Sequence, residues 1–158
     1  DVYKRQPEVF AATFSKLTEA GLNVQKRSDL FDQDLKAVWP LDCDVVLGDS
    51  FGEMFFYMAA ARVVSVGGGF VEKGAHNIIE PLALSKPVVT GPHIWTIEFP
   101  GEEAKEAGVL SVCADPSRLA QEIMVGMESD GSAEAAFHRE FTGASDRIAD
   151  MILNGWSA

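Results

Sequence analysis

From Asp44 onward, short apolar runs alternate with segments of helical spacing, and this alternation most constrains the fold. The apolar runs are residues 44–48, 63–66, 87–90 and 109–112. The spacing predicts helices at 51–61, 77–84, 98–107 and 115–127, with one helix or a pair within 132–153. Because each continuous apolar run leads into a helix, the runs predict parallel strands that are covered on both faces. The sequence therefore predicts an α/β fold with a Rossmann-like parallel sheet.

The first part of the chain is expected to contribute one helix and one strand. Residues 7–20 place apolar side chains on one helical face, Gly21 ends the helix, and residues 22–26 follow as a strand. Residues 28–42 have mixed character and predict a loop or partial helix. Residues 1–6 share no periodicity with the rest, and the chain does not begin with Met. We interpret it as a fragment with a doubtful opening, in which residues 7–158 form one domain.

The charge balance argues against a nucleic-acid partner. Thirteen Lys and Arg residues against 24 Asp and Glu residues give a net charge of −11, and no basic stripe offsets it. An anionic ligand would have to be held by backbone N–H groups and helix ends. The apolar runs are too short to span a membrane, so we expect a soluble domain. Cys43 and Cys113 have no CxxC spacing and are expected to be free thiols.

A first unusual loop follows the strand predicted at 44–48. Asp49 or Ser50 could cap the next helix, with Glu53 as an acid in its first turn. Gly52 is unexpected there, because glycine in a helix costs about 1 kcal/mol relative to alanine. It would make sense if a flat base or sugar lay against the backbone. Both interpretations remain open.

A second loop contains Gly67, Gly68, Gly69 and Gly74 between a strand and a helix, a pattern that suggests close backbone approach to a phosphate. It is neither a dinucleotide fingerprint nor a P-loop. Asn77 and Glu80 could form a capping box. Pro81 requires the helix to begin nearby, which leaves free N–H groups beside His76 and Asn77. Glu80 could accept hydrogen bonds from a ribose diol, and we favour ligand binding over capping alone; His76 could also be a buried core histidine.

The remaining candidates give little sign of catalysis. His93 follows the strand predicted at 87–90 and either faces a ligand or only fixes the turn. Metal-ligand spacing, a Gly-x-Ser-x-Gly elbow and a clear acid–base pair are all missing. The loops are suited to holding a ligand, so we expect no catalytic residue and no metal site in this chain.

Four motifs in order carry a resemblance to a known family. They are residues 48–54 (GDSFGEM), 66–68 (VGG), 74–81 (GAHNIIEP) and 86–93 (KPVVTGPH). In these motifs the chain resembles the C-terminal domain of the 3-deoxy-D-manno-octulosonic acid (Kdo) transferases, which are glycosyltransferases of the GT-B fold. The resemblance runs from about Pro7 to the end of the chain.

The resemblance implies which residues bind the donor substrate CMP-Kdo. Gly52, Glu53 and Met54 match the segment that lies along the nucleotide. His76, Asn77, Ile78, Ile79 and Glu80 match the helix start that binds phosphate and ribose. Arg5 is in register with the arginine of the family's Pro-Arg-His-Pro segment, which contacts the donor phosphate, although the residues around it here are Lys4, Gln6 and Pro7. Ala75 replaces a glycine that the family usually has.

The resemblance also implies a reaction. The family transfers Kdo from CMP-Kdo to the lipid A precursor (lipid IVA) in lipopolysaccharide biosynthesis, with inversion and without a metal or cofactor, at the cytoplasmic face of the bacterial inner membrane. Its catalytic base is a glutamate of an N-terminal acceptor domain that also contacts the membrane. That domain is not in this sequence, so the chain alone is expected to bind the donor weakly and to transfer nothing. The alternatives are another GT-B enzyme that uses a UDP- or ADP-sugar, and a non-catalytic nucleotide-binding module.

Overall fold

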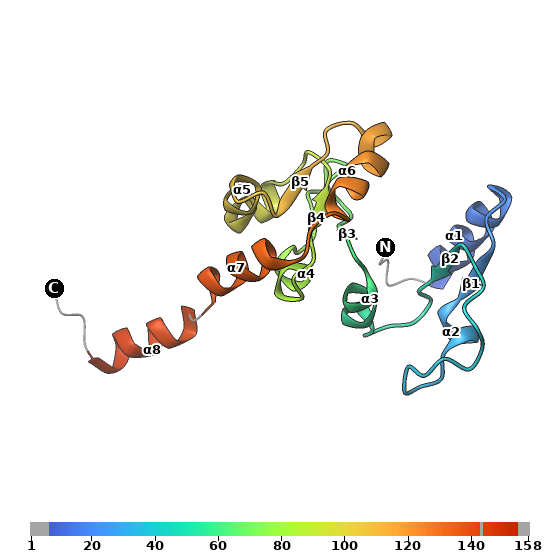
Figure 1. The fold of residues 1–158 in the computed structure, drawn as a ribbon, viewed down its shortest axis with the longest axis horizontal. Helices are drawn as coiled ribbons and strands as arrows, with labels where there is room; N and C mark the ends of the chain where they lie inside the picture. Colours follow the sequence, from blue (N-terminus) through green and yellow to red (C-terminus); the bar gives the residue numbers. More distant parts are fainter. Residues whose placement is uncertain (1–6, 143, 155–158) are drawn as a thin grey trace. The chain divides into compact units, whose positions relative to one another are not determined.

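The computed structural model describes residues 7–142 and 144–154, and the chain divides between Met54 and Phe55 into two compact units. Each unit contains a parallel sheet with helices beside it (Figure 1). Each unit is described by itself below. The predicted α/β class with parallel strands is confirmed.

The first unit is built on a two-stranded sheet. It contains helix α1 (Pro7–Glu19), strand β1 (Val24–Lys26), the short helix α2 (Arg27–Leu30) and strand β2 (Val45–Leu47). The strands pair in parallel, with Val24 opposite Val45. Leu30, only 1% exposed, anchors α2. Val46, in the middle of β2, is 37% exposed.

The second unit contains a three-stranded parallel sheet in the order β3-β4-β5. Its elements begin with α3 (Met54–Ala60), whose first residue ends the first unit, and continue with β3 (Val64–Ser65), α4 (Ile79–Ala83), β4 (Val88–Thr90), the 3₁₀ helix η1 (Trp95–Ile97), α5 (Glu98–Glu106), β5 (Leu110–Val112), the 3₁₀ helix η2 (Pro116–Arg118), α6 (Leu119–Gly126), α7 (Ser132–Phe141) and α8 (Ala144–Asn154). The central strand β4 is fully buried. Helix α7 packs against α4, α6 against β4 and α5 against β5.

The predicted elements are recovered, and the strands within each unit pair in parallel. The strands form two hydrogen-bonded sheets, one in each unit. Apolar runs indicate that a residue belongs to a strand without specifying the partner strand, and in the second unit β3 pairs with β4. The final predicted helix is a pair, α7 and α8, which was one of the two alternatives.

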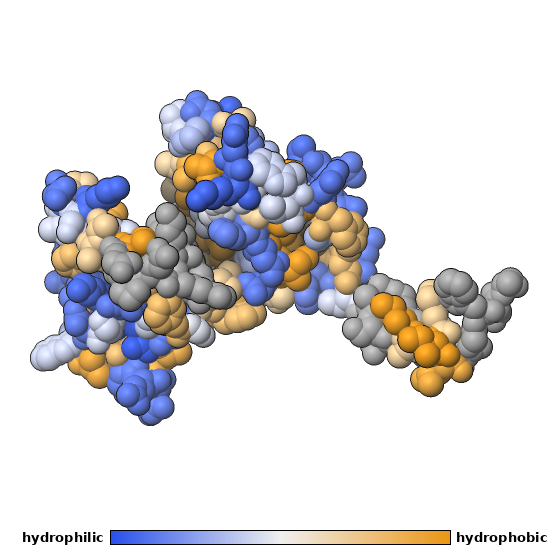
Figure 2. Space-filling model, turned by 180° about the vertical axis from the view of Figure 1, so that it is seen from behind, coloured by the Kyte–Doolittle hydropathy of each residue, from blue (hydrophilic) through white to orange (hydrophobic). Residues whose placement is uncertain are grey.

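Helix α8 carries an uncovered apolar surface. Its exposed large apolar residues are Ile148, Met151, Ile152 and Leu153, with exposed fractions from 56% to 81%. Figure 2 shows apolar surface gathered on this helix at the C-terminal end of the described chain. In contrast, the core of the second unit is formed by residues such as Ile78, Leu82 and Val88, each no more than 1% exposed.

Two glycines bring the loops after β3 and β4 into direct backbone contact. A Cβ atom added at Gly91 would lie 2.3 Å from the carbonyl carbon and oxygen of Gly69. One added at Gly69 would lie 2.5 Å from Thr90 Oγ1 and 2.7 Å from the Gly91 nitrogen. No side chain fits between these loops, so both positions require glycine.

We predict that Gly91→Ala destabilises the protein. The added methyl group must push the two loops apart, and overpacking of this kind costs about 1–3 kcal/mol of the free energy of unfolding. Gly101→Ala is the matched control, because its Cβ would have its nearest neighbour at 3.5 Å, an ordinary contact. Urea unfolding of both variants measures the difference. Equal midpoints for Gly91→Ala and the wild type would contradict this packing.

Candidate functional site

The glycine-rich loop after β3 and the loop at His93 after β4 contact each other in the second unit. The Ala75 amide donates to the His93 carbonyl at 2.8 Å, and the His93 amide donates to the Gly69 carbonyl at 3.0 Å. The His76 amide donates to the Gly67 carbonyl at 3.0 Å, and Thr96 Oγ1 donates to the Ala75 carbonyl at 2.5 Å. The stretch that leads into α4 is therefore held in place from both sides.

The glycines of the second loop have a structural explanation that the sequence did not distinguish from phosphate binding. Gly68 and Gly74 have φ values of +88° and +84°. A Cβ atom at Gly68 would lie 2.2 Å from the Gly74 carbonyl oxygen, and one at Gly74 would lie 2.4 Å from Thr96 Cγ2. Backbone conformation and loop packing thus require these glycines without any ligand.

Helix α4 begins later than the sequence predicted. It starts at Ile79 rather than Asn77, so Glu80 is its second residue and Pro81 its third. The capping-box alternative is therefore wrong, because the side chain of the N-cap residue Ile78 makes no cap and Glu80 lies one position too early. Asn77 instead accepts a hydrogen bond at Oδ1 from the Ile79 amide at 2.9 Å. The placement of Pro81 in the first turn is confirmed.

This helix start leaves polar groups available. Within the described part of the chain, the amides of Asn77, Ile78 and Glu80 donate to no protein acceptor, and the Glu80 carboxylate makes no hydrogen bond or ion pair. His76 and Asn77 are exposed, so the alternative that His76 is a core histidine is wrong. The Ile78 side chain is fully buried in the core, and only its main chain can reach a ligand. The Ile79 side chain is 36% exposed.

His93 contributes to the loop structure. Its main chain joins the two loops, and its half-buried ring lies edge-on to Trp95, with the ring centroids 5.3 Å apart. Trp95 is 51% exposed. Of the two interpretations of His93, fixing the turn is confirmed, and contact with a ligand stays a prediction.

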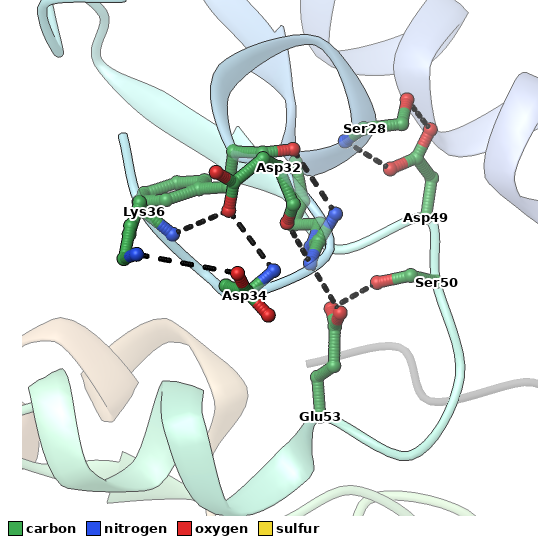
Figure 3. A network of polar contacts seen from close by, with 9 residues as sticks. Ser28, Asp32, Asp34, Lys36, Asp49, Ser50 and Glu53 are labelled. Atoms are coloured by element: carbon green, nitrogen blue, oxygen red, sulfur yellow. Dashed lines mark hydrogen bonds and ion pairs between the residues drawn. The ribbon is translucent and has the colours of Figure 1, made fainter. Parts of the chain in front are cut away.

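The first candidate loop lies in the first unit, and its acids do not cap α3. The Asp49 carboxylate accepts hydrogen bonds from the amide and the hydroxyl of Ser28 at 2.9 Å and 2.6 Å. Ser50 donates its hydroxyl to the Glu53 carboxylate (Figure 3). The capping interpretation of Asp49 and Ser50 is wrong, because both side chains bond elsewhere.

Gly52 and Glu53 lie before α3, which begins at Met54. Gly52 has φ +80°, and a Cβ atom added there would have no neighbour within 4 Å. A left-handed backbone explains the glycine, so the premise that it lies inside a helix is wrong. Glu53 is not an acid of the first helical turn. Its carboxylate forms an ion pair with Arg27 at 2.5 Å.

Sequence reasoning missed Arg27. Its side chain is only 9% exposed, although an arginine after a short strand has no pattern that distinguishes it from a surface residue. Arg5, the remaining sequence-predicted site residue, lies outside the described residues.

Among the residues that the structure describes, no group of three or more His, Cys, Asp or Glu could hold a metal ion. None of the described helices has the length and apolar character of a membrane span.

Comparison with known proteins decides the family. The 3-deoxy-D-manno-octulosonic acid transferase of Bordetella pertussis is 38% identical over 162 aligned residues, which cover 94% of this chain. The enzyme of the same name from Haemophilus influenzae is 35% identical over 117 residues, 68% of this chain. The chain belongs to the Kdo transferase family. It spans 35% of the Bordetella Kdo transferase and 27% of the Haemophilus one. No protein-family model matches the chain.

A solved structure places the chain within that family's architecture. The C-terminal CMP-Kdo binding domain of WaaA from Acinetobacter baumannii aligns with a TM-score of 0.68 and 26% identity. The alignment covers 85% of this chain and 67% of the other. The chain therefore corresponds to the C-terminal domain of a Kdo transferase, as the four motifs predict.

We predict that Gly52→Ala destabilises the first unit even though its methyl group meets no neighbour. An L-residue in the left-handed region costs about 1–2 kcal/mol, whereas asparagine tolerates that region better. Gly52→Asn should therefore cost less than Gly52→Ala in urea unfolding. If alanine were tolerated as well as asparagine, the left-handed conformation of this loop would be contradicted.

Proposed function

We propose that this chain holds the donor CMP-Kdo for a Kdo transferase. The observation that carries the proposal is the start of α4, where three unbonded amides and the Glu80 carboxylate lie within a motif that the family shares. The structural neighbour, a CMP-Kdo binding domain, and the related transferases support it.

In this proposal the phosphate of CMP is bound by main-chain groups. With a net charge of −11, the chain offers no cationic field to attract an anion. The amides of Asn77, Ile78 and Glu80 supply donors without adding charge, and the exposed His76 and Asn77 side chains lie next to them in sequence. The Glu80 carboxylate accepts hydrogen bonds from the ribose hydroxyls. The Ile79 amide is bonded to Asn77 Oδ1, so Ile79 contributes to the site by shaping the turn between the Ile78 and Glu80 amides.

Gly52, Glu53 and Met54 form a second proposed donor-binding segment, in the first unit. The left-handed Gly52 is exposed and open, so its backbone is accessible to a flat group. Arg5 is proposed to contact the donor phosphate on the strength of the family resemblance alone.

The reaction that we propose for the whole protein is direct displacement at the anomeric carbon of Kdo, with inversion and without a metal. A glutamate from outside these 158 residues takes the proton of an acceptor hydroxyl on the lipid A precursor, the new glycosidic bond forms, and CMP departs with the bonding electrons. Amides at the start of α4 stabilise the departing phosphate. We place this reaction at the cytoplasmic face of the inner membrane and expect the chain alone not to perform it.

Nucleotide preference tests the proposal. CMP should bind and UDP should bind about tenfold more weakly or not at all, because a site that hydrogen-bonds one base leaves polar groups unpaired with another. Titration calorimetry measures both affinities. Tighter binding of UDP would favour a GT-B enzyme that uses a UDP-sugar, and failure to bind either nucleotide would contradict the proposal.

Glu80→Ala tests the ribose contact. Losing a hydrogen bond to a charged group costs about 1.5–3 kcal/mol, so the Kd for CMP should rise roughly 10- to 150-fold. Glu72→Ala removes an exposed acid from the preceding loop and is the matched control. An unchanged Kd in Glu80→Ala would remove Glu80 from the site.

A further inference from the structure

Arg27 is a buried cation that joins separate loops of the first unit. It opens α2 directly after β1, and its side chain is only 9% exposed. Nη1 donates to the Phe31 carbonyl at 3.2 Å and Nη2 donates to the Asp32 carbonyl at 2.9 Å. Nη2 also lies 2.5 Å from Glu53 Oε1. A buried charge is tolerated only when it is paired and hydrogen-bonded, and Arg27 meets both conditions through residues far apart in sequence.

The Asp32 carbonyl, which accepts the hydrogen bond from Arg27 Nη2, belongs to a loop with hydrogen bonds of its own. Asp32 Oδ1 accepts hydrogen bonds from the amides of Asp34 and Lys36, both at 2.9 Å. The Asp32 amide donates to the Lys36 carbonyl at 3.0 Å. The guanidinium group is therefore oriented by a preformed turn, and its orientation fixes where the Glu53 carboxylate must lie.

Both oxygens of the Glu53 carboxylate are engaged. Oε1 pairs with Arg27, and Oε2 accepts from the Ser50 hydroxyl. The Glu53 side chain is 18% exposed. Because both oxygens are already bonded, the Glu53 carboxylate holds its own loop in place. We therefore assign ligand contact at this segment to the main chain of Gly52–Met54.

A second tie holds the other end of the same segment. Ser28, the neighbour of Arg27 on α2, donates its amide and its hydroxyl to Asp49. Residues 49 and 53 are thus both fixed to α2. The stretch between them contains Phe51, 54% exposed, and the left-handed Gly52. Helix α2 therefore holds both ends of this exposed stretch, through Ser28 at Asp49 and Arg27 at Glu53.

We propose that Arg27 is a positioning residue for donor binding, which acts through the Glu53 carboxylate to fix the backbone of Gly52–Met54. The proposal rests on the proposed function, because it assumes that this segment contacts the nucleotide. It assigns Glu53 a role in holding its own loop rather than in contacting the donor with its side chain.

The experiment compares Arg27→Met and Arg27→Lys with the wild type in two measurements. Hydrogen–deuterium exchange without ligand should show amides 49–54 exchanging about tenfold faster in Arg27→Met, with β4 unchanged, because the ion pair is lost. Titration calorimetry should show the Kd for CMP rising about tenfold or more in the same variant. Arg27→Lys keeps the charge but loses the planar fork, so both effects should be intermediate. If Arg27→Met does not fold, Arg27→Lys carries the test.

Arg118→Met is the matched control. It removes an arginine from the exposed ion pair with Glu122, in which the Arg118 side chain is 60% exposed. It should leave both the exchange of residues 49–54 and the Kd for CMP unchanged. All variants are measured at a temperature at which their thermal melts show them folded, so lower global stability does not imitate weaker binding.

Two results would overturn the proposal. One is unchanged exchange of residues 49–54 in Arg27→Met. The other is faster exchange with a Kd for CMP within about twofold of the wild type, which is close to the precision of affinity differences. A wild-type protein that does not bind CMP would instead overturn the proposed function, and the exchange measurement would still decide whether Arg27 positions the segment.

Discussion

The second unit depends on one close contact, the packing of Gly69 directly against Gly91. With no side chain between them, the loops after β3 and β4 share backbone hydrogen bonds through His93, and the stretch that leads into α4 is held between them. The amides at the start of α4 are fixed before any ligand arrives. Such preorganisation lowers the entropic cost of binding and suits a site that must recognise a phosphate ester with main-chain groups.

The first unit uses charge where the second uses backbone packing. Its buried Arg27 is neutralised by Glu53 and hydrogen-bonded to two carbonyl groups, so it fixes a loop without offering a positive surface. In a chain with a net charge of −11, this buried cation shapes a segment, and the anion of the proposed donor is assigned to main-chain amides.

The sequence predicted the elements well and their details less well. The apolar runs located β2, β3, β4 and β5, because burial imposes a direct pattern on residue type, and β1 lies within the strand predicted separately at 22–26. They did not predict which strands pair within each unit, since pairing depends on contacts between residues distant in the chain. Gly52 was correctly noticed, but the premise that it lies inside a helix was wrong, because a glycine signal does not separate a helix position from a left-handed turn. Arg27 was missed because its burial arises from partners up to 26 positions away, at Glu53.

The most direct test of the account is an amide-resolved nuclear magnetic resonance titration of the protein with CMP. The account predicts that the amide signals of Asn77, Ile78 and Glu80 shift as CMP is added, because these are the donors that it assigns to the phosphate. If CMP binds while these three signals stay in place and other amides shift, the assignment of the phosphate to the start of α4 is contradicted.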